Sequence, residues 1–167
     1  SDAQTIDDLD DYAWPQTDWF DYSEMRERAE QARQTQALSC GYMAPFFFHN
    51  KLRGLEQSLI DPLLGPDLTH EIVRRISDFF YGHHRLMFEA CDGLIDLAQV
   101  TDDLGSQTGP LISLELYHEF YAPQHKRFID LCHEFGIKVF HHDDGSIREF
   151  LPPLVDMGID ILNPIQW

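Results

Sequence analysis

Four short apolar segments, separated by longer stretches with helical character, constrain the fold of this chain more than any other feature. The segments cover residues 37–43, 93–101, 137–142 and 159–162. The last two connections from helix to strand are short, and strands linked through helices in this way are parallel, with right-handed crossovers. We therefore expect an α/β fold whose four parallel strands form either half of a (β/α)8 barrel or a small open sheet.

The stretches between these segments show the periodicity and the end signals of helices. We expect helices over residues 51–64, 68–90, 113–136 and 146–157. The second is the clearest, because its apolar side chains recur every three or four residues. Pro123 is expected to kink or split the third helix near Tyr121, and Gly136 is expected to end it as a left-handed residue.

The first 36 residues differ in character from the rest of the chain. Residues 1–22 are acidic and contain turn-forming residues, so they predict an irregular lead-in whose aromatic side chains dock on the fold. Residues 22–36 are rich in Glu, Arg, Gln and Ala and predict an exposed helix. We assign residues 37–167 to the β/α units.

The composition excludes several classes of function. The chain carries 29 acidic and 12 basic residues, a net charge of −17, which argues against binding to nucleic acid or to an anionic membrane. No apolar run approaches the roughly 18 residues of a membrane span, and the N-terminus lacks the features of a signal peptide. Three cysteines without metal-type spacing predict buried thiols, which suit a cytoplasmic protein.

Candidate chemistry lies where two of the strands end in polar residues. One strand runs into VTDDLGSQTG, residues 100–109, and the next runs into VFHHDDG, residues 139–145. Parallel strands bring their carboxyl ends to one edge of a sheet, and α/β enzymes place their sites there. We therefore expect the two polar ends to lie close together.

The second of these ends carries a histidine and a carboxylate on one side. Side chains alternate along a strand, so His142, Asp144 and Phe140 share a side, while His141 points to the other and is expected to pack beneath a helix. An imidazole with a carboxylate forms half of a site for zinc or a similar divalent ion, or an acid–base pair. A purely structural pair, bonded to neighbouring strand ends, is the alternative.

The first of these ends carries Asp102 and Asp103. One of the two should face the mouth of the sheet, where a raised pKa would make it a proton donor. The alternative is an acidic loop that caps a helix. Gly105 would bring backbone N–H groups toward a ligand, and Gln107 offers an amide to a polar substrate.

Other residues near the strand ends are also expected at the substrate. The segment APFFFHN follows the first strand, and its phenylalanines, of which Phe46 is the first, either line a pocket or pack in the core. Tyr42 precedes this segment, and Asn163 follows the last strand. Together with Phe140, these residues are the candidates for contact with a small-molecule substrate.

Longer segments around the same positions point to a known family. They are DDLGSQTGPLISLELYHEFYAPQHK and KVFHHDDGSIREFLPPLVDMGIDILNPIQ, with GYMAPF and WPQTDWFDY earlier in the chain. They resemble the uroporphyrinogen decarboxylase superfamily, and more narrowly its decarboxylase-like branch, which includes cobamide-dependent methyltransferases. The resemblance implies a (β/α)8 TIM barrel with its site at the carboxyl ends of the strands.

The resemblance also implies that this chain is the central part of such a barrel, with further strands before residue 1 and after Trp167. Four strands cannot close a barrel of this kind. We therefore expect either a fragment or a half-barrel that covers its open edges with another copy, as a homodimer.

In the methyltransferase branch, a His-x-Cys sequence at the matching strand end supplies two zinc ligands, and a later cysteine supplies a third. His142 matches the histidine, and Asp144 stands in place of the cysteine as a harder ligand. The leading hypothesis is therefore methyl transfer with a corrinoid on a partner protein, and with zinc or another divalent metal at these two residues. Asp102, Asp103 and Gln107 would position the substrate.

In the decarboxylase branch, catalysis needs no metal or cofactor, because a carboxylate stabilises the protonated pyrrole and a tyrosine assists. The matching segment, APFFFHNKLRG, has no tyrosine after Pro45, and Tyr42 is not at the matching position. Decarboxylation of a porphyrinogen or a related carboxylated ring is the second hypothesis. A non-catalytic half-barrel that serves as a binding or assembly module is the third.

Overall fold

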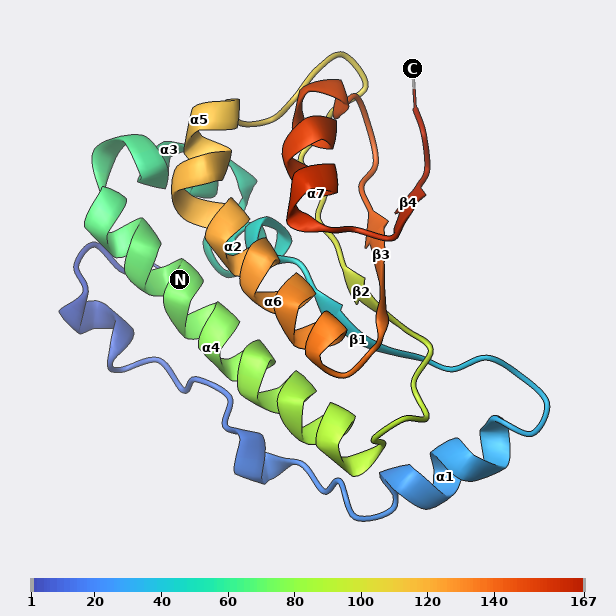
Figure 1. Cartoon of the computed structure of the whole chain (residues 1–167). Coiled ribbons are helices and arrows are strands. Elements are labelled where there is room, and N and C mark those ends of the chain that lie inside the picture. Colours follow the sequence, from blue (N-terminus) through green and yellow to red (C-terminus); the bar gives the residue numbers. More distant parts are fainter. Residues whose placement is uncertain (1, 167) are drawn as a thin grey trace.

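A four-stranded parallel sheet forms the centre of the computed structural model, which describes residues 2–166. The strands are β1 (Ser39–Met43), β2 (Leu97–Val100), β3 (Lys138–His142) and β4 (Ile161–Asn163). They lie side by side in the order of the chain, β1-β2-β3-β4 (Figure 1). Every neighbouring pair is parallel, as the sequence predicts, so the carboxyl ends of all four strands meet at one edge.

Helices fill each connection between successive strands. Between β1 and β2 lie α2 (Pro45–Arg53), α3 (Leu55–Leu64) and α4 (Pro66–Ala90). Between β2 and β3 lie α5 (Leu114–Leu116), the π-helix Tyr117–Tyr121 and α6 (Ala122–Glu134). Between β3 and β4 lie the 3-10 turn Arg148–Phe150 and α7 (Leu151–Met157), while α1 (Met25–Ala32) precedes the sheet. The result is a regular succession of β/α units.

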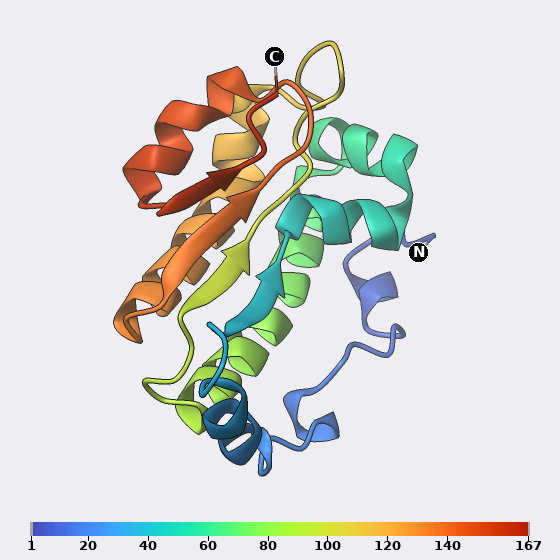
Figure 2. The same cartoon turned by 90° about the vertical axis from the view of Figure 1, so that its right-hand side faces the viewer.

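The helices cover one face of the sheet only (Figure 2). On that face Ala98, Val100 and Val139 are buried against α4 and α6, where Phe88 and Phe128 complete the core. The alternate side chains of β2 and β3 face the other way and are at least partly exposed. A sheet with helices on one face is the wall of a (β/α)8 barrel, and the molecule has the architecture of part of such a barrel.

Most of the predicted helix boundaries are confirmed, and one helix begins earlier in the chain than predicted. The π-helix ends just before Pro123, whose missing N–H interrupts the α-helical hydrogen bonds, and Gly136 follows α6 with φ of +69°. The short helix predicted within residues 51–64 is confirmed as α3, but residues 51–53 belong to α2, which begins at Pro45 and is separated from α3 by Gly54 (φ +84°). The segment APFFFHN is therefore the first half of a helix.

The N-terminal lead-in is irregular, as predicted, and runs along the outer side of α4 (Figure 1). Arg75 Nη1 donates to the carbonyl of Leu9, and Tyr22 Oη lies 2.6 Å from His83 Nδ1. The helix that follows, α1, contains no buried residue. Within residues 2–166, no helix is both long enough and apolar enough to cross a membrane.

The loops after β2 and β3 touch each other closely. Ser146 N donates to the carbonyl of Ser106 over 2.8 Å, and Gly105 lies against Gly145. A Cβ on Gly145 would lie 2.7 Å from the carbonyl carbon of Gly105, and Gly145 also has φ of +93°. This contact fixes the spacing between the two polar strand ends.

We predict that Gly145→Ala destabilises the chain more than Gly93→Ala, by about 2 kcal/mol of unfolding free energy. Both glycines have positive φ, but a Cβ on Gly93 would meet nothing within 4 Å, so it serves as the matched control. Urea unfolding of both variants measures the difference. Equal losses in the two variants would show that the loops separate without cost.

Candidate functional site

The candidate site lies at the edge where β2, β3 and β4 end. Asp103 comes three residues after β2, His142 is the last residue of β3, and Asp144 follows two residues later. One ligand atom from each of these side chains lies within 4.8 Å of the other two. Since three nitrogen and oxygen donors at this spacing can converge on a single ion, the three residues form a candidate metal cluster.

The imidazole of His142 is oriented by the strand beside it. Its Nδ1 lies 3.1 Å from Asn163 Oδ1, so Nδ1–H donates to this amide oxygen. Nε2 then carries the lone pair, and it lies 3.7 Å from Asp144 Oδ1. Metal-binding histidines are held in this way, with the distal nitrogen donating to a second group. Asn163, a predicted substrate residue, therefore lies where it can set the tautomer of His142.

The two carboxylates of the cluster are positioned by their own contacts. The backbone N–H of Asp144 donates to the Asp103 side chain. The side chain of Gln166 bridges Asp144 and Gly145. Its Nε2 donates to Asp144 Oδ1 over 3.3 Å, and its Oε1 accepts from Gly145 N over 2.8 Å. Burial raises the pKa of Asp103, and the carboxylates of Asp102 and Asp144 raise it further. A cation between the carboxylates would relieve that repulsion, so the donor set fits a divalent ion.

Asp102 is separated from this cluster and is buried. Its two oxygens accept from Phe46 N over 2.9 Å and from Phe47 N over 2.7 Å, which satisfies the N-terminus of α2. His125 Nε2 lies 3.2 Å from Oδ2, and Tyr117 Oη lies 2.9 Å from His125 Nδ1. The helix-capping alternative for the acidic loop therefore describes Asp102, while Asp103 faces the mouth of the sheet.

A second histidine–carboxylate pair lies beneath the site. His141 and Asp143 are both fully buried, with His141 Nε2 3.5 Å from Asp143 Oδ2. His141 Nδ1 donates to the carbonyl of Val100, and Asp143 Oδ1 accepts from Leu104 N. The alternation along β3 correctly directed His141 away from the site. The same alternation applied to Asp143 would have found its partner.

Burial favours the uncharged form of both groups. It raises the pKa of Asp143 to about 9, with a further contribution from the Asp102 carboxylate, and lowers the pKa of His141 to about 3. His141 Nε2 and Asp143 Oδ2 face each other over 3.5 Å without forming a hydrogen bond. The pair supports the loop between Asp103 and Gly105 without introducing a charge into the core.

The remaining predicted residues lie at different depths around the site. Tyr42 is exposed at the end of β1, and Phe140 is half-buried on the face without helices. Gln107 is exposed in the loop after β2, while Gly105 packs directly against Gly145. Phe46 is fully buried, so its prediction as a substrate contact is wrong.

The ring of Phe46 packs in the core because Asp102 starts α2 directly after β1 and turns this side chain inward. It lies 5.2 Å from the ring of Tyr121. The half-exposed Phe47 lies beside Tyr42 instead, with 6.3 Å between ring centroids. Of the phenylalanines considered from the sequence, Phe46 therefore follows the core-packing alternative.

Comparison with known proteins gives two positive findings. The family model for uroporphyrinogen decarboxylase (URO-D) matches residues 4–164. Among solved structures, a methyltransferase from Methanosarcina mazei is similar, with 17% sequence identity and a TM-score of 0.64. The alignment covers 92% of this chain and 45% of that one, so the chain spans less than half of that structure's length. At this identity the likeness concerns the fold. A search of the curated proteins gave no match.

We predict that Asp143→Asn changes the pH dependence of stability. Asn keeps the acceptor for Leu104 N and places an N–H donor toward His141, so the variant should fold. In the wild type, Asp143 releases its proton near pH 3.8 in the unfolded chain but only near pH 9 in the folded chain. Between these two pH values the folded chain therefore holds one proton more than the unfolded chain. Above pH 6.5, where His141 is neutral in both states, the unfolding free energy should fall as pH rises, by up to about 1.4 kcal/mol per unit.

The Asn variant should lack this decline, because it has no proton to lose at position 143. Chemical unfolding of both proteins at a series of pH values measures it. Parallel curves for the two proteins would mean that Asp143 is ionised in the folded state. Asp143→Ala, which leaves the buried N–H of Leu104 without its acceptor, should be less stable than Asp143→Asn by about 2 kcal/mol at any pH.

Proposed function

The chain belongs to the uroporphyrinogen decarboxylase family, and from that premise we propose that it serves a metal-assisted methyl transfer, with the methyl group carried by a corrinoid on a partner protein. The observation that carries the proposal is the cluster of Asp103, His142 and Asp144, whose ligand atoms lie within 4.8 Å of one another. The fold of the Methanosarcina mazei methyltransferase supports the same branch of the family.

The three side chains make a nitrogen–oxygen donor set for a divalent ion such as zinc. Such an ion would supply Lewis acidity at the heteroatom that gives or receives the methyl group. Two carboxylates make the set harder than one built with thiolates, so it suits substrates that bind through nitrogen or oxygen as well as sulfur. Asp144 would therefore be the residue that tunes the chemistry, since the family resemblance implies a cysteine ligand at this position.

Other residues of the chain would bind and orient the reactants. Asn163 holds the imidazole of His142, and Gln166 restrains Asp144. Tyr42 and Phe140 offer partly exposed aromatic surface on the side of the sheet that carries the cluster. A small substrate bound there would have one polar end at the cluster and its apolar part against these rings.

A second candidate function is decarboxylation of a porphyrinogen or a related ring without any metal. One observation favours it, since Asp103 and Asp144 place two carboxylates together at the site. A ring that becomes cationic as carbon dioxide leaves would be stabilised by such a pair. The two candidates differ in whether activity depends on a bound metal ion.

We predict that the purified chain binds one Zn²⁺ ion and that His142→Ala weakens this binding at least about tenfold. Calorimetric titration of the metal-free chain measures both affinities. His118→Ala is the matched control, because His118 is exposed on the π-helix that precedes α6, away from the cluster. Asp144→Cys should strengthen Zn²⁺ binding more than Mn²⁺ binding, because thiolate is the softer ligand.

Equal Zn²⁺ affinity in the wild type and in His142→Ala would show that the ion does not bind at this cluster. Failure of Asp144→Cys to discriminate between the two metals would show that residue 144 is not a ligand.

The reaction is tested with methylcobalamin as methyl donor and a small thiol as acceptor. We expect metal-dependent loss of the methyl–cobalt absorbance, with transfer of the methyl group to sulfur, and at least about a tenfold loss of rate in His142→Ala. Release of carbon dioxide from uroporphyrinogen by the metal-free chain, with no methyl transfer, would contradict the proposal and support the second candidate.

A further inference from the structure

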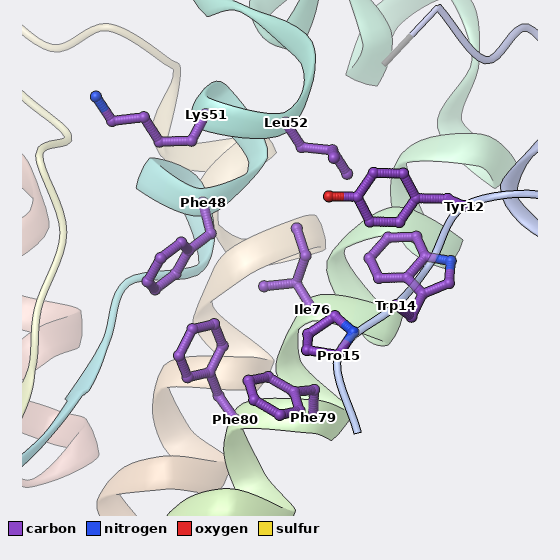
Figure 3. Close-up of a pocket in the computed structure, with 9 residues that line it drawn as sticks. All are labelled: Tyr12, Trp14, Pro15, Phe48, Lys51, Leu52, Ile76, Phe79 and Phe80. Carbon is purple, nitrogen blue, oxygen red and sulfur yellow. The ribbon is translucent and has the colours of Figure 1, made fainter. Parts of the chain in front are cut away.

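A cavity lies between the lead-in and the helices α2 and α4, and none of its lining residues belongs to the candidate site. Its volume is about 270 Å³. Figure 3 shows its walls, which are mostly aromatic. The lining residues are Tyr12, Trp14, Pro15, Phe48, Lys51, Leu52, Ile76, Phe79 and Phe80. We call this the aromatic cavity.

Contacts between its rings hold the walls of the aromatic cavity in place. Phe48 and Phe80 stack with 4.4 Å between their centroids, and Phe79 lies edge-on to Phe80 at 5.1 Å. Tyr12 and Trp14 meet edge to face at 4.8 Å, and Trp14 Nε1 donates to the carbonyl of Leu9. The rings from the lead-in and the rings from the helices are therefore positioned before any ligand arrives.

Lys51 is the charged residue in the lining of the aromatic cavity, within a chain and a lead-in that are strongly acidic. Four of the five residues at positions 7–11, just before Tyr12, are aspartates, and the whole chain has a net charge of −17. Lys51 extends away from the centre of the cavity in Figure 3, with its Nζ 4.9 Å from the Phe47 ring. Arg75 lies 5.8 Å from the Trp14 ring, but its guanidinium is paired with Asp10 and Glu71.

We propose that the aromatic cavity binds a quaternary ammonium group, such as the head of a choline-like molecule. Aromatic faces attract cations through their quadrupoles, most strongly for tryptophan and tyrosine. A primary ammonium needs three hydrogen-bond acceptors, and most of the lining side chains are apolar or aromatic. A permethylated nitrogen needs none, and its methyl groups pack against rings and against Ile76 and Leu52.

Tyr12 offers the additional contact that such a ligand could use. Its side chain is 44% exposed, and its hydroxyl points across the aromatic cavity toward Leu52 in Figure 3. A hydroxyl or carboxylate at the other end of the ligand could accept from it. This site is independent of the methyl-transfer proposal, and either could fail without the other.

The test compares choline with 3,3-dimethylbutan-1-ol, which has the same shape but carbon in place of the charged nitrogen. Titration of each into the whole chain, followed by the NMR signal of the Trp14 indole N–H, reports binding at the aromatic cavity. We expect choline to bind at least about tenfold more tightly than its neutral counterpart. Equal affinities would show an apolar cavity without cation recognition, and no shift with choline would show that no ammonium ligand binds; either result overturns the proposal.

Variants at Tyr12 test whether its aromatic ring contributes to choline binding. Tyr12→Phe keeps the aromatic face and should leave choline affinity within about twofold, whereas Tyr12→Leu removes the ring and should weaken it about fivefold. The side chain is exposed, so both variants should fold as the wild type does. Equal choline affinity in Tyr12→Leu and Tyr12→Phe would contradict a role for the aromatic face.

Discussion

The buried carboxylate of Asp102 is the contact on which the arrangement of this molecule depends. Two backbone N–H groups at the start of α2 donate to it, and His125 of α6 lies 3.2 Å away. Hydrogen bonds to a charged group contribute roughly 1.5–3 kcal/mol each, and an unpaired buried carboxylate would be very costly. Asp102 therefore ties the end of β2 to the helix before it and to the helix after it. Its neighbour Asp103 is left free to face the mouth of the sheet.

The sequence predicts the elements that depend on local periodicity. The four strands, the interruption before Pro123 and the left-handed Gly136 all follow from patterns within a few residues. The alternation along β3 also places His142 and Asp144 on one side. The structure adds Asp103 to His142 and Asp144, and so shows which of the two adjacent aspartates, Asp102 or Asp103, faces the site.

What the sequence misses depends on partners far along the chain. The start of α2 at Pro45 is stabilised by a carboxylate 56 residues beyond Phe46, so no local pattern marks it. In the sequence Asp143 looks like one more acid in an acidic loop. In the structure it is buried beside His141, and burial raises its pKa to about 9. The aromatic cavity likewise joins the lead-in to α4, two segments whose contact no local pattern marks.

If Asp103, His142 and Asp144 hold one metal ion, crystals grown with zinc will show it. Data collected at the zinc absorption edge locate the ion by its anomalous scattering. We expect one strong peak at about 2.0–2.2 Å from His142 Nε2 and from an oxygen of each carboxylate. A crystal with zinc bound only elsewhere, or with no peak at this cluster, would contradict it.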